Sequence, residues 1–206
     1  MKKVIIFDMD GTLVDSSVTI VNAINHVRKN LNLTPLDKEL ILEKVNDPDL
    51  DPAKYFYEVP AFTSQHESWF SQYYTDNHEK EIQLYNGIEK LLKKLKKQGF
   101  ILAVATNSYR GSTIESLSHL NILDYFDSLA CYDDVGRGKP APDMLEKNME
   151  DTNIKREDAL FIGDSERDLL ASKSAKIDYI MINWGFSDYK DAIHKVEDLE
   201  KAIIEA

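Results

Sequence analysis

Hydrophobic and polar positions follow two different patterns along the 206-residue chain. After residue 82, short apolar runs alternate with amphipathic segments, which predicts strands alternating with helices. The expected strands cover about 4–7, 100–105, 128–132, 159–162 and 179–182, and the expected helices cover about 88–97, 111–120, 166–175, 189–205 and a segment opening at Pro140. Such alternation predicts an α/β fold with a mainly parallel, Rossmann-like sheet and helices on both faces.

The stretch from 15 to 82 has a different pattern, because its apolar positions repeat at helical spacing and it contains no glycine. One helix is expected to begin at Asp15-Ser16-Ser17, and others to cover about 36–46 and 62–80, with a loop at 46–52. An aromatic stripe beginning at Phe62 predicts the core of a helical bundle. More than ninety residues separate the first two strands, whereas a βαβ unit needs about 30. We therefore expect an α/β domain formed by residues 1–14 and 83–206, and a helical insert formed by residues 15–82.

Charge and composition restrict the class of partner. The net charge of −11 argues against a nucleic-acid or anionic-membrane surface. The apolar runs are shorter than the ~20 residues that a membrane span needs, so we expect a cytoplasmic protein. The single cysteine, Cys131, excludes an internal disulfide and a cysteine-based zinc site. Its apolar neighbours predict a buried structural thiol.

Polar residues follow four of the expected strands. They are Asp8 and Asp10; Thr106, Asn107 and Ser108; Lys139 between Gly138 and Pro140; and Asp164 and Asp168. Each group alone is explained as a helix cap, a turn or a solvated acid. Four such groups in order, each at a strand end, favour one shared site at the carboxyl edge of the sheet.

The residue types at this edge indicate a particular chemistry. Clustered carboxylates are typical ligands of Mg²⁺, which keeps waters and substrate phosphate as its other ligands. Zinc and iron are disfavoured because these groups contain neither histidine nor cysteine. A nearby lysine is suited to binding a phosphate oxygen.

These four groups also resemble a known family. Asp8-Met-Asp10-Gly-Thr-Leu, Thr106-Asn107, Lys139 in Gly-Lys-Pro-Ala-Pro-Asp, and Gly-Asp164-Ser-Glu-Arg-Asp168 match the motifs of the haloacid dehalogenase-like hydrolases. The resemblance is to the phosphoglycolate phosphatase and β-phosphoglucomutase branch, which has a helical cap after the first strand. It runs nearly end to end and includes Trp184-Gly185-Phe186.

The resemblance implies a Mg²⁺-dependent phosphatase acting on a small phosphorylated metabolite. Asp8 would be the nucleophile that forms an aspartyl-phosphate, and Asp10 the general acid and base. The metal would be held by Asp8, the backbone carbonyl of Asp10, Asp164 and, through water, Asp168. The phosphoryl oxygens would be bound by Thr106, the Asn107 amide and Lys139. We further expect a monomer or weak homodimer that binds neither nucleic acid nor a membrane.

Two alternatives stay open on the sequence. A phosphosugar mutase of the same branch shares the motifs, and a non-catalytic binding protein could use the same fold. A mutase calls for cationic groups in the cap, but residues 15–82 contain twelve acids and six bases, which favours hydrolysis.

The cap loop, expected at 46–54, contains Asp47, Asp49 and Asp51. A second anionic group on the substrate would therefore need Lys54, Arg28 or Arg110. A neutral or cationic leaving group is at least as compatible with the sequence, and Tyr55, Phe56 and Tyr57 are candidates to face it or to pack in the cap.

Overall fold

The computed structural model describes residues 2–45, 47, 49–184 and 191–206. The backbone packs as two units. The first, called the core unit below, contains residues 1–15 and 83–206, and the second, called the cap unit, contains residues 16–82.

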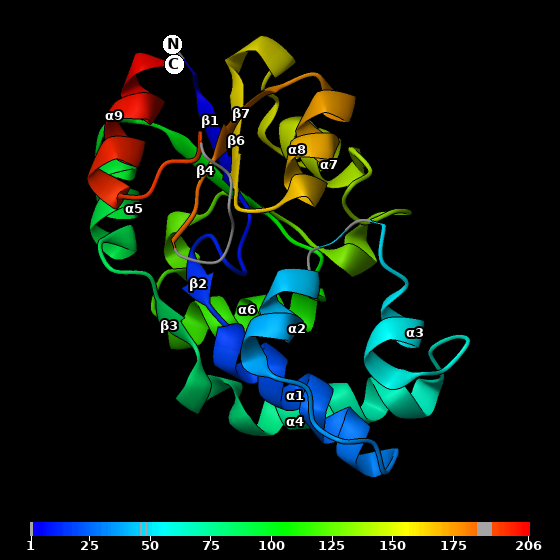
Figure 1. The fold of residues 1–206 in the computed structure, drawn as a ribbon. Helices are drawn as coiled ribbons and strands as arrows, with labels where there is room; N and C mark the ends of the chain where they lie inside the picture. The colour runs from blue at the N-terminus through cyan, green and yellow to red at the C-terminus, as the bar shows by residue number, and fades with distance from the viewer. Residues whose placement is uncertain (1, 46, 48, 185–190) are drawn as a thin grey trace. The chain divides into compact units, whose positions relative to one another are not determined.

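A five-stranded sheet forms the centre of the core unit (Figure 1). Its strands are β1 (Val4–Phe7), β4 (Ile101–Ala105), β5 (Ser128–Ala130), β6 (Ala159–Gly163) and β7 (Asp178–Met181), in the order β5-β4-β1-β6-β7. All four pairings are parallel. The central strand β1 is fully buried along its length, as expected for a strand covered on both faces.

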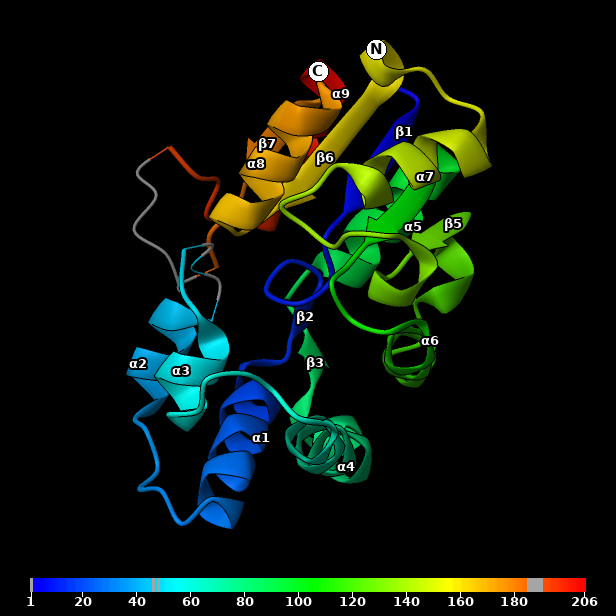
Figure 2. The ribbon, with the colours of Figure 1, turned by 90° about the vertical axis from the view of Figure 1, so that its right-hand side faces the viewer.

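Helices lie on both faces of this sheet. On one face are α7 (Asp143–Thr152) and α8 (Glu166–Ala175), while α5 (Ile88–Lys97) and α9 (Val196–Glu205) lie together on the other (Figures 1 and 2). Helix α6 (Arg110–His119) follows β4, and short 3-10 turns η1 (Leu123–Tyr125), η2 (Tyr132–Asp134) and η3 (Arg156–Asp158) join the other elements. The prediction of a mainly parallel α/β fold is confirmed.

A short antiparallel ribbon closes the insertion. Strand β2 (Val14–Asp15) pairs with β3 (Gln83–Leu84) through Val14↔Leu84 and Asp15↔Gln83. The ribbon brings together the two chain segments that lead into and out of the cap unit. The sequence pattern did not predict it, because two-residue strands are too short to show periodicity.

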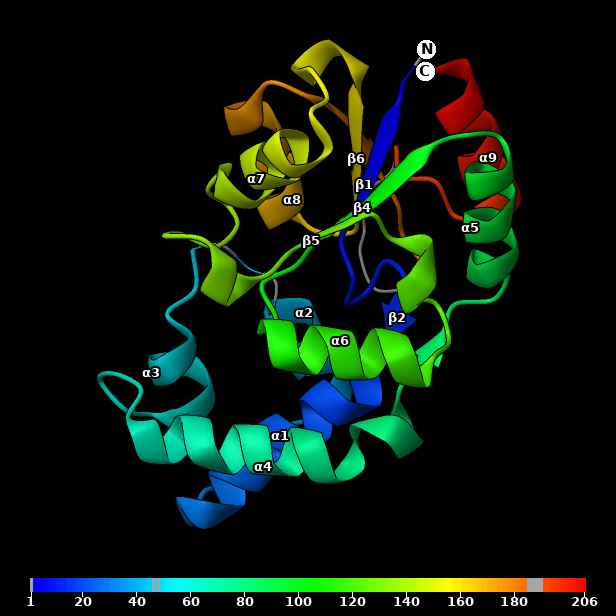
Figure 3. The same ribbon diagram turned by 180° about the vertical axis from the view of Figure 1, so that it is seen from behind.

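Within its described residues, the cap unit contains four helices. They are α1 (Ser17–Asn30), α2 (Lys38–Lys44), α3 (Pro52–Tyr57) and α4 (Ser64–Glu81). Helices α1 and α4 lie side by side (Figure 3). Their apolar core is formed by Val21, Ile24, Val27, Ile41, Phe56 and Tyr57, with Trp69 and Phe70 packed against it. These helices and their shared core make residues 16–82 a compact helical unit.

The cap unit differs from the sequence prediction in two details. Helix α3 begins within the expected loop, because the Asp51 carboxylate accepts hydrogen bonds from the backbone N–H groups of Ala53 and Lys54 and Pro52 occupies the first turn. Phe62 precedes α4 and is exposed, so the prediction that it belongs to the bundle core is wrong. Asn46 and Pro48 of the expected loop, and Gly185 and Phe186, lie outside the described residues.

Two further predictions concern Cys131 and the membrane. Cys131 is fully buried, and burial raises the pKa of its thiol to about 11, as expected for a structural residue. In the part of the chain that the structure describes, no helix has the length and apolar character of a membrane span.

Candidate active site

Strand register places the predicted residues at one edge of the sheet. Phe7 is level with Val104 of β4 and with Ile162 of β6. The residues that follow, Asp8, Ala105 and Gly163, therefore lie at the same height at the carboxyl ends of three adjacent strands. Asp8 still donates its backbone N–H to the Ile162 carbonyl at 2.8 Å, so the sheet fixes the backbone from which its carboxylate projects.

Lys139 is the centre of a buried charge cluster. Its Nζ lies 2.5 Å from Asp8 Oδ1 and 2.7 Å from Asp168 Oδ1. The side chains of all three residues are at most 8% exposed. Burial alone would lower the pKa of Lys139, but the carboxylates of Asp168 and Asp8 outweigh it and raise that pKa. The lysine is therefore a fixed cation.

Asp168 has a second, structural role. Its Oδ2 accepts hydrogen bonds from the Ser165 hydroxyl at 2.6 Å and from the Ser165 backbone N–H at 3.2 Å. Ser165 in turn accepts from the Asp168 backbone, so the two residues form a capping box at the start of α8. One oxygen of Asp168 thus holds the helix end while the other faces Lys139.

Three carboxylates are grouped closely enough to share a cation. Each of Asp8, Asp164 and Asp168 offers an oxygen, and these oxygens lie within 4.8 Å of one another. Burial and the neighbouring carboxylates of Asp8 and Asp168 raise the pKa of Asp164 well above its usual range. Lys139 offsets only part of the repulsion among these three carboxylates, and an all-oxygen donor set with excess negative charge fits Mg²⁺.

The pKa of Asp8 is also raised, to about 7. Burial is the main cause, and it outweighs the opposing effect of Lys139; Asp168 and Asp10 add to the increase. A bound divalent cation would favour the charged carboxylate and counter this increase. The strand end therefore concentrates negative charge that a cation would stabilise.

Gly11 gives Asp164 room beside the first motif. Gly11 has φ of +84°, and a Cβ built there would lie 2.3 Å from Asp164 Oδ2. A side chain at this position would be strained by its backbone conformation and would displace the carboxylate. The absence of a side chain at Gly11 thus leaves the space that the Asp164 carboxylate occupies.

Asp10 is held differently from the three grouped carboxylates. Its Oδ2 accepts a hydrogen bond of 2.9 Å from the Ser108 hydroxyl. Thr106, which is buried, accepts the Ser108 backbone N–H on its hydroxyl at 3.1 Å. The turn after β4 is therefore bonded both to itself and to the end of β1.

Asn107 contacts the backbone of Lys139 with both ends of its side chain. Its Nδ2 donates to the Lys139 carbonyl at 3.1 Å, and its Oδ1 accepts the Lys139 backbone N–H at 2.8 Å. The structure thus brings together all seven residues that the sequence nominated: Asp8, Asp10, Thr106, Asn107, Lys139, Asp164 and Asp168. Sequence reasoning assigned no role to Ser108, although a hydroxyl next to Thr106-Asn107 was a usable signal.

The chain is similar over most of its length to proteins of one known family. The family model described as haloacid dehalogenase-like hydrolase matches residues 5–182. The chain belongs to the haloacid dehalogenase-like hydrolase family. The match extends from β1 to the end of β7 and includes the cap unit, so the family predicted from the four motifs is confirmed.

Relatives of this haloacid dehalogenase-like hydrolase carry phosphatase names. It is 26% identical over 180 residues to the pyrophosphatase PpaX of Halalkalibacterium halodurans, covering 87% of this chain and 83% of that protein. It is 30% identical over 207 residues to the phosphoglycolate phosphatase of Colwellia psychrerythraea, covering 92% and 88%. A crystal structure of a "predicted phosphatase" from Clostridium acetobutylicum superposes with a TM-score of 0.87 at 26% identity, covering both chains fully.

Two of the three cations proposed to bind a second anionic group have other partners. Arg28 is buried in the cap unit and donates to the backbone carbonyls of Thr34, at 2.7 Å, and Phe56. Arg110 of the core unit donates to both oxygens of Asp134 and to the Leu129 carbonyl. Both guanidinium groups therefore support the fold of their own unit. Tyr57 and Phe56 are likewise buried in the cap core.

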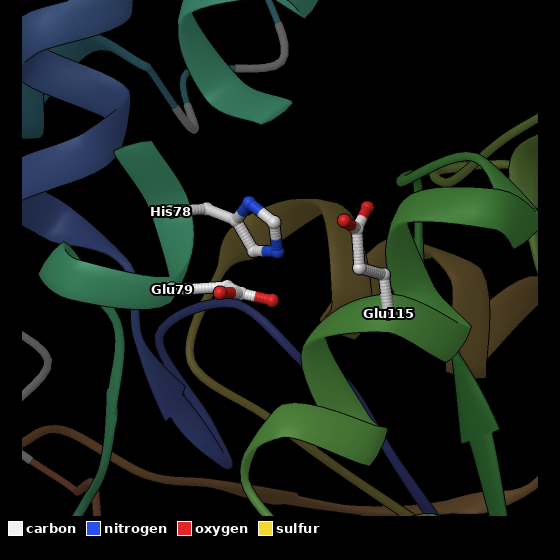
Figure 4. Close-up of side chains that lie close together, drawn as sticks. All are labelled: His78, Glu79 and Glu115. Carbon is white, nitrogen blue, oxygen red and sulfur yellow. The ribbon is translucent and has the colours of Figure 1, made fainter. Parts of the chain in front are cut away.

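Three titratable residues outside this site, His78, Glu79 and Glu115, have surroundings that are common for structural or surface side chains. Figure 4 draws His78 and Glu79 of α4 and Glu115 of α6. Within the cap unit, His78 is buried, stacks on the Tyr74 ring and has Nδ1 2.9 Å from the Tyr74 carbonyl. Glu79 and Glu115 are exposed on their helices, as surface glutamates commonly are.

Proposed function

We propose that the protein is a Mg²⁺-dependent phosphatase that hydrolyses a small phosphorylated metabolite through an aspartyl-phosphate on Asp8. The observation that carries the proposal is the buried cluster in which Lys139 lies between Asp8 and Asp168 while Asp164 completes the acidic group. Burying these charges is costly, and catalysis of phosphoryl transfer is a use that explains the cost.

In the first step, an Asp8 oxygen attacks phosphorus and the bond to the leaving oxygen breaks. Asp10 gives its proton to that oxygen, so the leaving group departs as an alcohol. In the second step, a water attacks the aspartyl-phosphate while Asp10 takes its proton, and the bond from phosphorus to Asp8 breaks. Phosphate and the free Asp8 carboxylate are regenerated. The Ser108 hydroxyl orients Asp10 for both transfers.

The phosphoryl group is bound by Lys139 and the turn that contains Thr106. Lys139 is suited to this role because it keeps its charge in a buried site. Mg²⁺, held by Asp8, Asp164, Asp168 and the Asp10 backbone carbonyl, would neutralise charge on the phosphoryl oxygens. The cap, residues 15–82, would exclude water and contact the leaving group.

The bonding partners of Arg28 and Arg110 restrict the substrate class. Arg28 and Arg110 are bonded to groups of their own units, which leaves Lys54 of the three cations considered. This favours a leaving group without a second strong negative charge, such as a sugar, polyol, nucleoside or amine. It also disfavours a phosphosugar mutase, which must bind a sugar bisphosphate.

Release of phosphate from para-nitrophenyl phosphate tests the reaction. We expect turnover with Mg²⁺, a loss of roughly 100-fold or more in EDTA, and recovery when Mg²⁺ is added back. Turnover that is indifferent to EDTA would contradict the metal requirement. A panel of phosphorylated metabolites, compared by kcat/KM, then tests the leaving group, and formation of an isomeric sugar phosphate without phosphate release would instead indicate a mutase.

A further inference from the structure

We propose that Asn107 is a positioning residue, whose side chain holds the Lys139 segment in place and leaves phosphate binding to other groups. The inference rests on the proposed function, because it assigns the effect of Asn107 to the phosphoryl-binding ammonium of Lys139. It refines the sequence prediction, in which Asn107 binds the phosphate. Any contact between Asn107 and a phosphoryl oxygen is then left to its backbone N–H.

A reciprocal pair of hydrogen bonds joins the Asn107 side chain to the backbone of Lys139. Asn107 Nδ2 donates to the Lys139 carbonyl, and the Lys139 backbone N–H donates to Asn107 Oδ1, at 3.1 and 2.8 Å. Two bonds from one planar amide fix both the position and the direction of the Lys139 peptide groups. The Asn107 side chain is therefore fixed beside the Lys139 backbone. Both its Nδ2 and its Oδ1 face that backbone.

Lys139 needs a fixed backbone to hold its ammonium group in place. It lies in the segment between η2 and α7, outside any helix or strand, yet its ammonium must lie between two buried carboxylates. A loop backbone has little intrinsic order, and a lysine side chain loses much rotamer freedom when it is fixed. Asn107 follows β4 closely, so its amide links the loop to the rigid end of the sheet.

The Asn107 side chain occupies the space beside Gly138. A Cβ built on Gly138 would lie 2.7 Å from Asn107 Oδ1 and 2.9 Å from the Tyr132 ring. Tyr132 is 47% exposed and can turn aside, but Asn107 is held by its two bonds. The glycine before Lys139 therefore lets the amide approach the lysine backbone.

A double-mutant cycle between Asn107→Ala and Lys139→Met tests the coupling. On para-nitrophenyl phosphate with Mg²⁺, we expect Asn107→Ala to lower kcat/KM by roughly 10- to 100-fold, the loss typical of about 1 Å of misplacement. If Asn107 acts through Lys139, the double variant is no worse than Lys139→Met. If the Asn107 side chain binds phosphate itself, the two losses multiply, and the proposal is overturned. Asn30→Ala, which removes an exposed asparagine side chain from α1, should change nothing.

A glycine substitution tests the same contact without touching Asn107 or Lys139. Gly138→Ala should reproduce the loss caused by Asn107→Ala, because the new methyl group displaces Oδ1. Combining the two changes should cause little additional loss, since the Asn107→Ala variant has no amide left to displace. The matched control is Gly111→Ala, where an added Cβ meets nothing within 4 Å. Wild-type activity in Gly138→Ala would overturn the proposal.

Binding of inorganic phosphate provides a readout that is independent of turnover. The increase in thermal unfolding temperature with phosphate concentration gives an affinity for each variant, and the unliganded temperature reports whether the fold is intact. We expect the affinities to show the same non-additivity. If the wild type binds phosphate but does not hydrolyse any substrate, the proposed function fails. The phosphate affinities of the single and double variants then still test whether Asn107 acts through Lys139. If it does neither, both proposals fail.

Discussion

Buried charged side chains have different partners in the two units. In the core unit, Lys139 lies between Asp8 and Asp168, and Asp164 adds a further carboxylate to the group. In the cap unit, the buried guanidinium of Arg28 donates instead to backbone carbonyls. Buried charges of the core unit thus contact one another, whereas the buried charge of Arg28 contacts mainly backbone oxygens.

This contrast helps to distinguish buried charges that serve activity from buried charges that stabilise the fold. A cation bonded to carbonyls is stabilised by its surroundings and stabilises them in return. Burying a carboxylate beside others destabilises its charged form: burial, reinforced by Asp168 and Asp10, raises the pKa of Asp8 to about 7 in spite of Lys139. Unfavourable arrangements of this kind persist at functional sites. Substitutions in the core cluster should therefore change activity more than stability, and substitution of Arg28 should do the reverse.

The largest effect is expected for Asp8→Asn. The amide has nearly the same shape but is not a nucleophile, so turnover of para-nitrophenyl phosphate should fall by on the order of 10⁴-fold or more. The fold should persist, because the change removes one of several mutually repelling carboxylates. Steady-state kinetics and circular dichroism measure the two parts.

Asp124→Asn is the control for Asp8→Asn, because it makes the same change at an exposed acid of the core unit. It should retain wild-type turnover. Substantial activity in Asp8→Asn would exclude the aspartyl-phosphate mechanism. Loss of the fold in that variant would show that the core cluster is structural and would remove the contrast with the cap.

Arg28→Met should have the largest effect on stability. It leaves the Thr34 and Phe56 carbonyls without their charged donor, so urea unfolding should show a loss of about 2–3 kcal/mol, roughly 30- to 150-fold in the unfolding equilibrium. The Glu58 contact adds little, since Glu58 is 62% exposed. kcat/KM per folded molecule should change by less than about threefold.

Lys29→Met is the matched control for Arg28→Met, since Lys29 is the next residue along α1 and is exposed. It should leave the unfolding free energy within about 0.5 kcal/mol of wild type. A large increase in KM with unchanged stability in Arg28→Met would show that Arg28 binds substrate. The distinction between the two units would then be wrong.

The sequence predicted the core unit more completely than the cap unit for a physical reason. Parallel strands end at one edge of a sheet, so residues such as Asp8 and Asp164 were expected to meet once the strands were recognised. Helical periodicity predicts which side chains are buried, but it does not predict which groups a single buried side chain will bond to. The carbonyl partners of Arg28 depend on how α1 and α3 pack, and the start of α3 depends on the Asp51 cap.

Contacts made by loops were missed for a related reason. Asn107 and Ser108 were visible as polar residues after β4, but the sequence contains no information on whether such groups face a ligand or the protein. Their bonds to Lys139 and Asp10 join segments that are 32 and 98 residues apart along the chain. Only the folded backbone brings such residues together.

A smaller effect on activity is expected for Ser108→Ala. The hydroxyl orients Asp10 but does not react, so kcat should fall by roughly 5- to 20-fold, the equivalent of one hydrogen bond, with little change in KM. Ser108→Thr, which keeps the hydroxyl, should recover part of the loss, and Ser118→Ala on the exposed face of α6 should be neutral. An unchanged kcat in Ser108→Ala would show that Asp10 needs no such support.

The smallest effect on stability is expected for Arg110→Met. This variant tests whether the role of a cation depends on its bonding partners or on the unit in which it lies. Arg110 lies in the core unit, yet it resembles Arg28 in donating to a backbone carbonyl, that of Leu129, as well as to Asp134. Its side chain is 38% exposed, so solvent screening should limit the loss of unfolding free energy at pH 7 to about 0.5–1 kcal/mol.

The pH dependence of this loss has a definite sign. The hydrogen bond from Arg110 lowers the pKa of Asp134 below its usual value of 3.8. The pair therefore stabilises the folded state fully above the unfolded pKa, and this stabilisation disappears as pH falls through the lower, folded pKa. Urea unfolding of wild type and Arg110→Met should differ at pH 7 and converge below about pH 4. A difference that persists at low pH would assign the effect to the Leu129 carbonyl alone, which would make Arg110 a still closer counterpart of Arg28.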